Sequence, residues 1–242
     1  MSSRKPYKRV LIKLSGEVLA GGQGFGLDQP TLKYVAEQIC EVHNAGVQVA
    51  IVVGGGNFIR GDAFSSDGHI DRSVADQMGM LGTVMNSLAL QSAIERAGVP
   101  TRVQSAVSIA QVAENFIRRR AIRHLEKGRV VVLAAGTGNP YFTTDTAAAL
   151  RGLEIEAECL IKATKVDGVY NKDPKKHSDA IRYETISFDE VISKKLGVMD
   201  QTAFTMCQEN NLQIIVLDLN QPGAMSKAAR GEAVGTLVRG DL

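Results

Sequence analysis

The chain of 242 residues contains no tryptophan, and aromatic residues make up only 5% of it. Its three cysteines, Cys40, Cys159 and Cys207, are far apart, lie in apolar surroundings and form no CxxC pair. This pattern argues against a disulfide framework and against a zinc site built on paired cysteines. Free, buried cysteines are typical of a reducing compartment. We therefore expect a cytoplasmic protein.

Long apolar runs and an excess of one charge are also missing. No apolar run approaches the roughly 20 residues that a membrane helix needs, and no apolar segment of a signal peptide follows the basic residues near the start. The 28 basic residues nearly balance the 26 acidic ones, for a formal net charge of +2. The basic cluster of Arg118, Arg119 and Arg120 is typical of a solvated helix face. We expect neither a membrane nor a nucleic acid as partner.

Several familiar site motifs do not occur. The chain has no Gly-Lys dipeptide and therefore no P-loop, and the glycine-rich run 21–26 has Leu27 where the dinucleotide motif requires glycine. HExxH and GxSxG are absent, and the four histidines are dispersed. The sequence thus predicts no metal site made by protein side chains.

Strand-like and helix-like segments alternate along the chain. The pattern predicts strands at residues 9–14, 47–53, 101–107, 129–135, 158–163, 213–219 and 235–239. It predicts helices at 28–46, 71–97, 111–127, 144–156, 189–195, 200–210 and 224–230. This order predicts an α/β fold, a three-layer αβα sandwich with a mainly parallel central sheet. Because no linker interrupts the chain, we expect residues 1–242 to form a single domain.

Four loops rich in glycine or threonine directly follow apolar strands, at residues 13–16, 54–57, 136–145 and 162–170. In an open parallel sheet such loops emerge together at the carboxyl ends of the strands, where ligands bind. Glycine lets main-chain N–H groups approach a phosphate, and lysine supplies the opposite charge. The four loops therefore predict a site for two phosphorylated ligands.

Each feature also has a structural interpretation. Lys13 stands at a strand end, where a charge can simply reach solvent, although Ser15 and Gly16 place further donors beside it. A plain turn needs one glycine rather than the three at 54–56, each of which costs roughly 1 kcal/mol of backbone entropy, and this favours close approach of a ligand. Asp145 lies at a predicted helix start, so helix capping and a role in the chemistry both stay open.

These residues resemble the amino acid kinase family, and within it the bacterial-type UMP kinases, from Val10 to the segment 235–238. The most specific matches are residues 13–17, 54–61, 76–81, 136–145 and 162–169. The resemblance implies an αβα fold, a homohexamer, and a magnesium requirement met by MgATP. It also implies the reaction of ATP with UMP to give ADP and UDP in pyrimidine nucleotide synthesis.

The resemblance further implies which residues act at the site. Lys13, Arg60 and Asp145 would be catalytic, with Asp145 orienting the lysine or the metal. ATP would be bound by Lys13, Leu14, Ser15, Gly16, Gly56, Arg60, Thr164, Tyr170 and Asp173. UMP would be bound by Gly55, Asp76, Thr137, Gly138, Asn139, Pro140, Tyr141, Phe142, Thr143 and Thr144.

The resemblance also implies how the protein is regulated, and the sequence pattern indicates where subunits make contact. The family is typically activated by GTP and inhibited by UTP. Gln91 and Glu95 stand on the face where basic effector-binding residues are expected, while Arg102 is retained, so UTP inhibition is the expectation and GTP activation stays open. The predicted helix 71–97 carries apolar and small residues around much of its circumference, which predicts subunit contacts along it.

Two other classes of protein stay open. A kinase of the same fold acting on a carboxylate or carbamate would keep the phosphate loops but not the acceptor residues Asp76 and 137–144. A nucleotide-sensing module without activity would be expected to lack Lys13, Arg60 or Asp145, and all three are present.

Overall fold

The computed structural model describes residues 5–59, 70–174 and 176–240. They form a nine-stranded sheet in the order β4-β3-β5-β2-β1-β6-β8-β9-β7. Every neighbouring pair is parallel except β8–β9, so the predicted, mainly parallel sheet is confirmed. The strands are β1 (Arg9–Leu14), β2 (Gln48–Val53), β3 (Thr101–Ser105), β4 (Glu114–Asn115), β5 (Val130–Ala134), β6 (Cys159–Thr164), β7 (Thr185–Ser187), β8 (Gln213–Asp218) and β9 (Thr236–Arg239).

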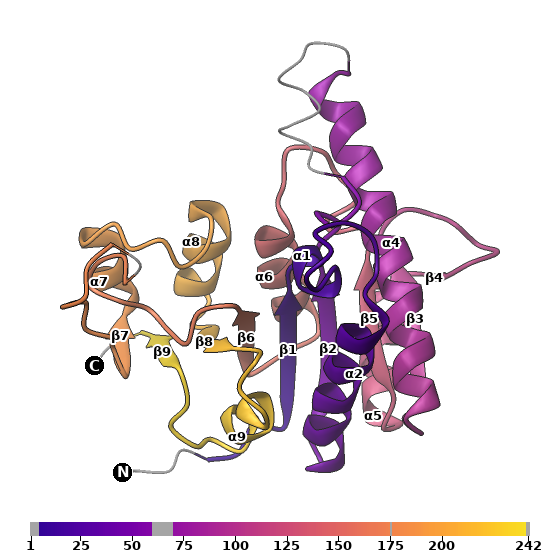
Figure 1. Cartoon of the computed structure of the whole chain (residues 1–242). Coiled ribbons are helices and arrows are strands. Elements are labelled where there is room, and N and C mark those ends of the chain that lie inside the picture. The colour runs from indigo at the N-terminus through magenta and orange to yellow at the C-terminus, as the bar shows by residue number, and fades with distance from the viewer. Residues whose placement is uncertain (1–4, 60–69, 175, 241–242) are drawn as a thin grey trace.

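Helices cover both faces of this sheet, as the sequence predicts (Figure 1). On one face lie α1 (Gly16–Leu19), α2 (Gln29–Asn44), α4 (Arg72–Arg96) and α9 (Ala224–Ala229), which share one hydrophobic cluster with the strands. On the other face lie α5 (Arg118–Glu126), α6 (Thr144–Glu154), α7 (Phe188–Ser193) and α8 (Gln201–Glu209), which share the second cluster. All six residues of β1 are buried, as expected for a strand covered on both faces. Within the described residues no helix is long and apolar enough to cross a membrane.

The helix starts follow local capping signals. Asp28 caps α2 by accepting a hydrogen bond from the Thr31 N–H at 2.9 Å, with Pro30 in the first turn. Thr143 caps α6 in the same way, since its hydroxyl oxygen accepts from the N–H groups of Asp145 and Thr146. Asp145 therefore lies in the first turn of α6, beside the carboxyl ends of the central strands β1 and β6.

One predicted helix is wrong in its first part. Residues 111–117 are not helical; Glu114 and Asn115 instead form the edge strand β4, paired in parallel with Gln104 and Ser105 of β3. The Phe116 N–H also donates to the Ser105 carbonyl at 2.9 Å. These contacts give the backbone of 114–116 partners outside a helix, and α5 begins only at Arg118. The short elements α1 and β7 are missing from the sequence prediction.

Candidate active site

The four predicted loops follow the carboxyl ends of the parallel strands β1, β2, β5 and β6, so they lie at the same end of the sheet. In the sheet register Lys13 of β1 lies beside Val52 of β2 on one side and Lys162 of β6 on the other. The loops after these strands therefore start at the same level. The loop after β5 joins them through α6, whose Asp145 forms an ion pair with Lys13.

A first cavity of about 550 Å³ opens between these loops and helix α4. Many of the residues that the resemblance assigns to phosphate and UMP binding line it, whereas Gly138, Pro140 and Tyr141 lie in the same loop but not in its wall. The lining residues include Ser15, Gly16, Gly55, Gly56, Asp76, Thr137, Asn139, Phe142, Thr143 and Thr144.

The three consecutive glycines are required in part by main-chain packing. A Cβ at Gly55 would lie 2.4 Å from the carbonyl oxygen of Gly79 in α4, and one at Gly54 would lie 2.9 Å from the N of Gly16. A Cβ at Gly56 would come no closer than 3.7 Å to Glu17. Main-chain packing against α1 and α4 therefore requires glycine at positions 54 and 55, whereas it leaves room for a side chain at Gly56.

Two buried amide side chains hold this glycine loop. Asn57 and Asn86 donate to each other's side-chain oxygens at 3.0 and 2.7 Å. Asn86 also donates to the Gly54 carbonyl, and Asn57 to the Gly26 carbonyl, each at 2.7 Å. No local sequence pattern points to a role for Asn86, because its partners lie about thirty residues away in the chain.

Asp76 links helix α4 to the loop 136–143, which connects β5 to α6. Its carboxylate accepts a hydrogen bond from the N–H of Tyr141 at 2.8 Å, and its two oxygens share the Nε–H of Arg72, at 2.9 and 3.1 Å. Tyr141 has a φ of +72°, a strained conformation for a side chain of its size. Asp76 thus fixes the bend of the loop as well as lining the cavity.

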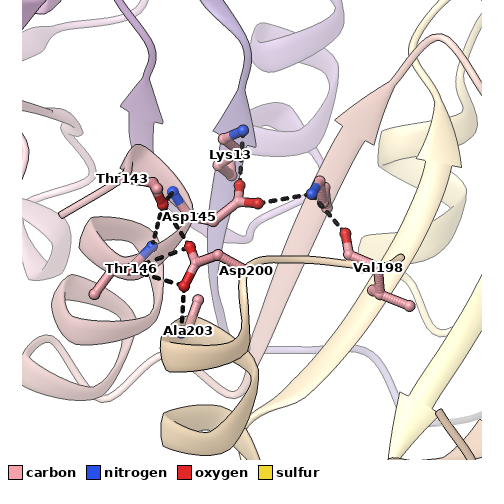
Figure 2. A network of polar contacts seen from close by, with 8 residues as sticks. Lys13, Thr143, Asp145, Thr146, Val198, Asp200 and Ala203 are labelled. Atoms are coloured by element: carbon pink, nitrogen blue, oxygen red, sulfur yellow. Dashed lines mark hydrogen bonds and ion pairs between the residues drawn. The ribbon is translucent and has the colours of Figure 1, made fainter. Parts of the chain in front are cut away.

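Between the loops lies a compact cluster of three charges (Figure 2). The ammonium of Lys13 lies 2.7 Å from Oδ1 of Asp145, and that of Lys162 donates to Oδ2 at 2.8 Å. Lys162 also donates to the carbonyl of Val198 at 2.6 Å. Each oxygen of the Asp145 carboxylate thus contacts one of the two lysines.

The three side chains are at most 16% exposed, so their charges are weakly screened by water. Burial on its own raises the pKa of Asp145, but the charges of Lys13 and Lys162 outweigh it and hold that pKa below its usual range. Burial lowers the pKa of Lys162, and Asp145 only partly restores it. Two lysine side chains around one carboxylate give the cluster an excess of positive formal charge, which suits an anion.

Lys162 is a site residue that the sequence analysis did not assign. Its signal was a lysine inside the otherwise apolar strand Cys159–Thr164, in the same Leu-Ile-Lys context as Lys13. Because the two strands are neighbours in register, these lysines project from the same face of the sheet. Two like charges at paired positions require an anion between them, and Asp145 supplies it.

A second cavity, of about 580 Å³, lies on the β6 side of the cluster. Thr164, Tyr170 and Asp173, which the resemblance assigns to the ATP nucleoside, all line it, together with Lys162 and Val198. Two predicted ATP-site residues are placed otherwise: the side chain of Leu14 is buried in the core, and Arg60 lies outside the described residues.

A model described as the amino acid kinase family matches residues 8–218. The chain belongs to the amino acid kinase family. It is similar to the solved structure of a UMP kinase from Bacillus anthracis, with 38% identity and a TM-score of 0.95 over 98% of each chain. It is also similar to a UMP kinase from Ureaplasma parvum (36% identity, TM-score 0.90, covering 98% of this chain and 99% of that one). A uridylate kinase from Archaeoglobus fulgidus is more distant (29% identity, TM-score 0.72, covering 95% and 99%).

Asp145→Asn should destabilise this family member strongly at neutral pH. Breaking a buried ion pair typically costs about 3–5 kcal/mol, because the remaining charge is left without a partner. The pKa of Lys162, already lowered in the fold, should fall further. Since the unfolded chain then binds more protons than the folded one, stability should rise with pH from that lowered pKa towards about 10.4.

Urea unfolding of Asp145→Asn at about pH 7 and about pH 9 measures this change. Asp189→Asn, at an exposed carboxylate, is the matched control and should alter stability little at either pH. An Asp145→Asn protein as stable as the control at neutral pH would show that the two lysines do not depend on this carboxylate.

Proposed function

We propose that this chain is a UMP kinase, which transfers the γ-phosphoryl group of ATP to UMP and releases ADP and UDP. The observation that supports this most is the charge cluster adjoining two cavities. Lys162 lines one of them, and Thr143 and Thr144, the neighbours of Asp145, line the other. Two nucleotides with their phosphates directed at the cluster would meet there.

Phosphoryl transfer between two nucleotides requires mainly that the reacting groups are positioned and that their negative charge is neutralised. An oxygen of the UMP phosphate forms a bond to the γ-phosphorus, the bond from that phosphorus to the bridging oxygen breaks, and the electron pair leaves with ADP. The attacking oxygen is already ionised at neutral pH, so no general base is required. Lys13 and Lys162 neutralise charge on the γ-phosphoryl oxygens, while Asp145 holds both ammonium groups in place.

Magnesium enters this proposal as part of the substrate MgATP, where it neutralises phosphate charge. Among the described residues no group of three His, Cys, Asp or Glu side chains could hold a metal ion. Phosphate oxygens would therefore be its main ligands. We also propose that Arg60 contacts the transferred phosphate, as the resemblance implies.

The acceptor cavity favours a nucleotide over a carboxylate or carbamate. Its wall combines the Asp76 carboxylate, which can accept hydrogen bonds from sugar hydroxyls, with polar groups of the loop 136–144. A small acceptor acid would fill little of a cavity of about 550 Å³. A non-catalytic nucleotide sensor would not require the two buried lysines held by Asp145.

An assay of ADP release with MgATP and, in turn, UMP, CMP, dUMP and a carboxylate acceptor tests the proposal. UMP should give the highest kcat/KM. In the same assay Lys13→Ala should lower kcat by about two to three orders of magnitude, the scale for loss of one preorganised charged donor. The fold should persist, because Lys162 still pairs with Asp145.

Lys33→Ala, which removes a lysine with a largely exposed side chain on α2, is the control and should leave kcat unchanged. Near-normal kcat in a folded Lys13→Ala protein would remove Lys13 from the mechanism. No ADP release with UMP in the wild-type enzyme would refute the proposed function itself.

Asp76→Asn should raise the KM for UMP more than the KM for ATP. The amide cannot accept from both sugar hydroxyls as a carboxylate can, and it weakens the contacts to Arg72 and to the Tyr141 N–H that shape the loop. Loss of a binding contact appears in KM, whereas loss of a transition-state contact appears in kcat. Equal increases in both KM values would contradict this assignment, and Asp189→Asn again serves as control.

We further propose that the chain is a single cytoplasmic domain that assembles as a homohexamer. One continuous sheet supports the single domain. Helix α4 supports the assembly: Val74, Leu81 and Met85 are 44%, 51% and 45% exposed and follow one side of the helix. The apolar surface is narrower than the sequence suggested, because Gly82, Thr83 and Ser87 are buried.

UTP would act as an inhibitor in the cavity proposed for UMP, since both carry the same nucleoside. GTP activation stays a prediction. A cavity of about 480 Å³ on the expected effector face is lined by Gln91 and Glu95 together with Leu88, Ser92 and Arg96. Arg102, the basic residue retained near the expected effector face, lies 3.4 Å from the Glu95 carboxylate. Gln91 donates to the Thr101 carbonyl at 3.2 Å, so these side chains tie α4 to β3.

Light scattering at micromolar concentration should give a mass several times the 26.0 kDa of one chain. Leu81→Glu places a charge on the exposed side of α4 and should dissociate the assembly. Leu88 is less suitable, because it packs against the core. Val112→Glu, at an exposed apolar residue away from α4, is the control. A monomeric wild-type protein would refute the hexamer, and an intact assembly in folded Leu81→Glu would refute the contact through α4.

A further inference from the structure

Asp200 is the N-cap of α8, yet it also contacts Thr143 and Thr146 at the start of α6, beside Asp145 (Figure 2). Its Oδ1 accepts from the Ala203 N–H at 2.9 Å. The hydroxyl of Thr146 donates to its two oxygens at 3.1 and 3.2 Å, and the hydroxyl of Thr143 donates to Oδ2. A helix cap needs only the first of these bonds.

The Thr143 bond decides how the start of α6 is arranged. The single hydroxyl hydrogen of Thr143 is directed at Asp200, so the oxygen's lone pairs are left to accept from the N–H groups of Asp145 and Thr146, at 3.1 and 3.2 Å. Asp200 thereby orients the residue that caps α6 and lines the acceptor cavity. The position of Asp145 depends on the same cap.

The segment that carries Asp200 also reaches Lys162. Val198, two residues earlier, accepts a hydrogen bond from the Lys162 ammonium at 2.6 Å. The charged and titratable groups around this ammonium are Asp145 from α6, Lys13 from β1 and Asp200 at α8, and Cys207 of α8 faces both carboxylates. Burial raises the pKa of Cys207 to about 12, so it stays neutral and Asp200 and Asp145 are the anions of this environment.

We propose that Asp200 is a positioning residue for the phosphoryl transfer: it orients Thr143 and hence the α6 start that carries Asp145, and it adds a carboxylate to the surroundings of the Lys162 ammonium. This rests on the proposed function. Asp200 touches neither nucleotide cavity in its lining, so it acts through Thr143 and Lys162. The segment 198–200 contacts Lys162 beside the second cavity, and Asp200 within it contacts Thr143 beside the first.

Three variants separate positioning from simple structural support. Asp200→Asn keeps an oxygen for the α8 cap but turns an amide donor towards Thr143 and removes the charge. Thr146→Val removes only the neighbouring tie between α6 and α8, at a buried residue of matching shape. Asp28→Asn makes the same chemical change at a helix cap that lies on the other face of the sheet.

Asp200→Asn should lower kcat by about 10- to 100-fold, the scale of a small misplacement of reacting groups. The KM for ATP should change by no more than about twofold. The alkaline limb of the kcat profile should move to lower pH, because the charge that raises the pKa of Lys162 is lost. Thr146→Val and Asp28→Asn should lower the unfolding temperature without moving that limb.

An unchanged kcat and pH profile in Asp200→Asn would overturn the proposal, as would equal losses of kcat in Asp200→Asn and Thr146→Val without a pH shift. Should Asp200→Asn fail to fold, Asp200→Ser keeps a good helix cap without the charge and must show the same two changes.

A measurement without substrate separates this proposal from the proposed function. In protein labelled with ¹³C at the lysine Cε, the Lys162 signal is identified by its absence in Lys162→Arg. Its titration midpoint should move to lower pH in Asp200→Asn and stay in place in Asp28→Asn. An unmoved midpoint overturns the proposal even if UMP is phosphorylated, and a moved midpoint supports the charge effect even if the acceptor is another nucleotide.

Discussion

The site depends on one carboxylate between two ammonium groups. Lys13 and Lys162 occupy paired positions on neighbouring strands and face the same side of the sheet, where their charges repel. Asp145 contacts both, at 2.7 and 2.8 Å, and so ties the start of α6, which Thr143 caps, to β1 and β6. Because the loop 136–144 ends at this helix, the acceptor cavity is positioned by the same contact. The glycine loop after β2, which Asn57 and Asn86 hold in place, forms another part of the wall of that cavity.

Burial makes this arrangement both costly and useful. Removing three charges from water is unfavourable, and well-packed apolar residues in their place would often be as stable or more so. In the proposed reaction the two lysines are in place before a phosphate arrives, so little reorganisation is needed when charge develops on it. Asp145 leaves the cluster with a net positive charge, which attracts an anion, while preventing the two ammonium groups from separating.

Elements that depend on local pattern were predictable, and those that depend on distant contacts were not. The buried runs of β1, β2, β5, β6 and β8, and the caps Asp28 and Thr143, carry their signals within a few residues. The edge strand at Glu114 was mistaken for helix because its partner, Gln104 in β3, is not visible in its own sequence. Likewise, Asp200 looks like an ordinary helix cap until the fold brings Thr143, 57 residues away, against it. The assignments of ATP and UMP residues came from the family resemblance rather than from pattern.

Helix α4 gives the acceptor side a different construction from the donor side. The donor cavity is walled by segments near β6 and α7, whereas the acceptor cavity rests on one long helix. Along its inner side α4 packs at Gly79 against Gly55 and holds Tyr141 through Asp76. The oxygen of the Thr83 hydroxyl also accepts a hydrogen bond from the N–H of Ala135 at 2.7 Å. Ala135 has a φ of +60°, so this bond supports a strained turn at the start of the loop 136–143. Because the opposite side of α4 carries the exposed Leu81 and Met85, a subunit bound there, as proposed, would contact the helix that lines the first cavity but none of the residues that line the second.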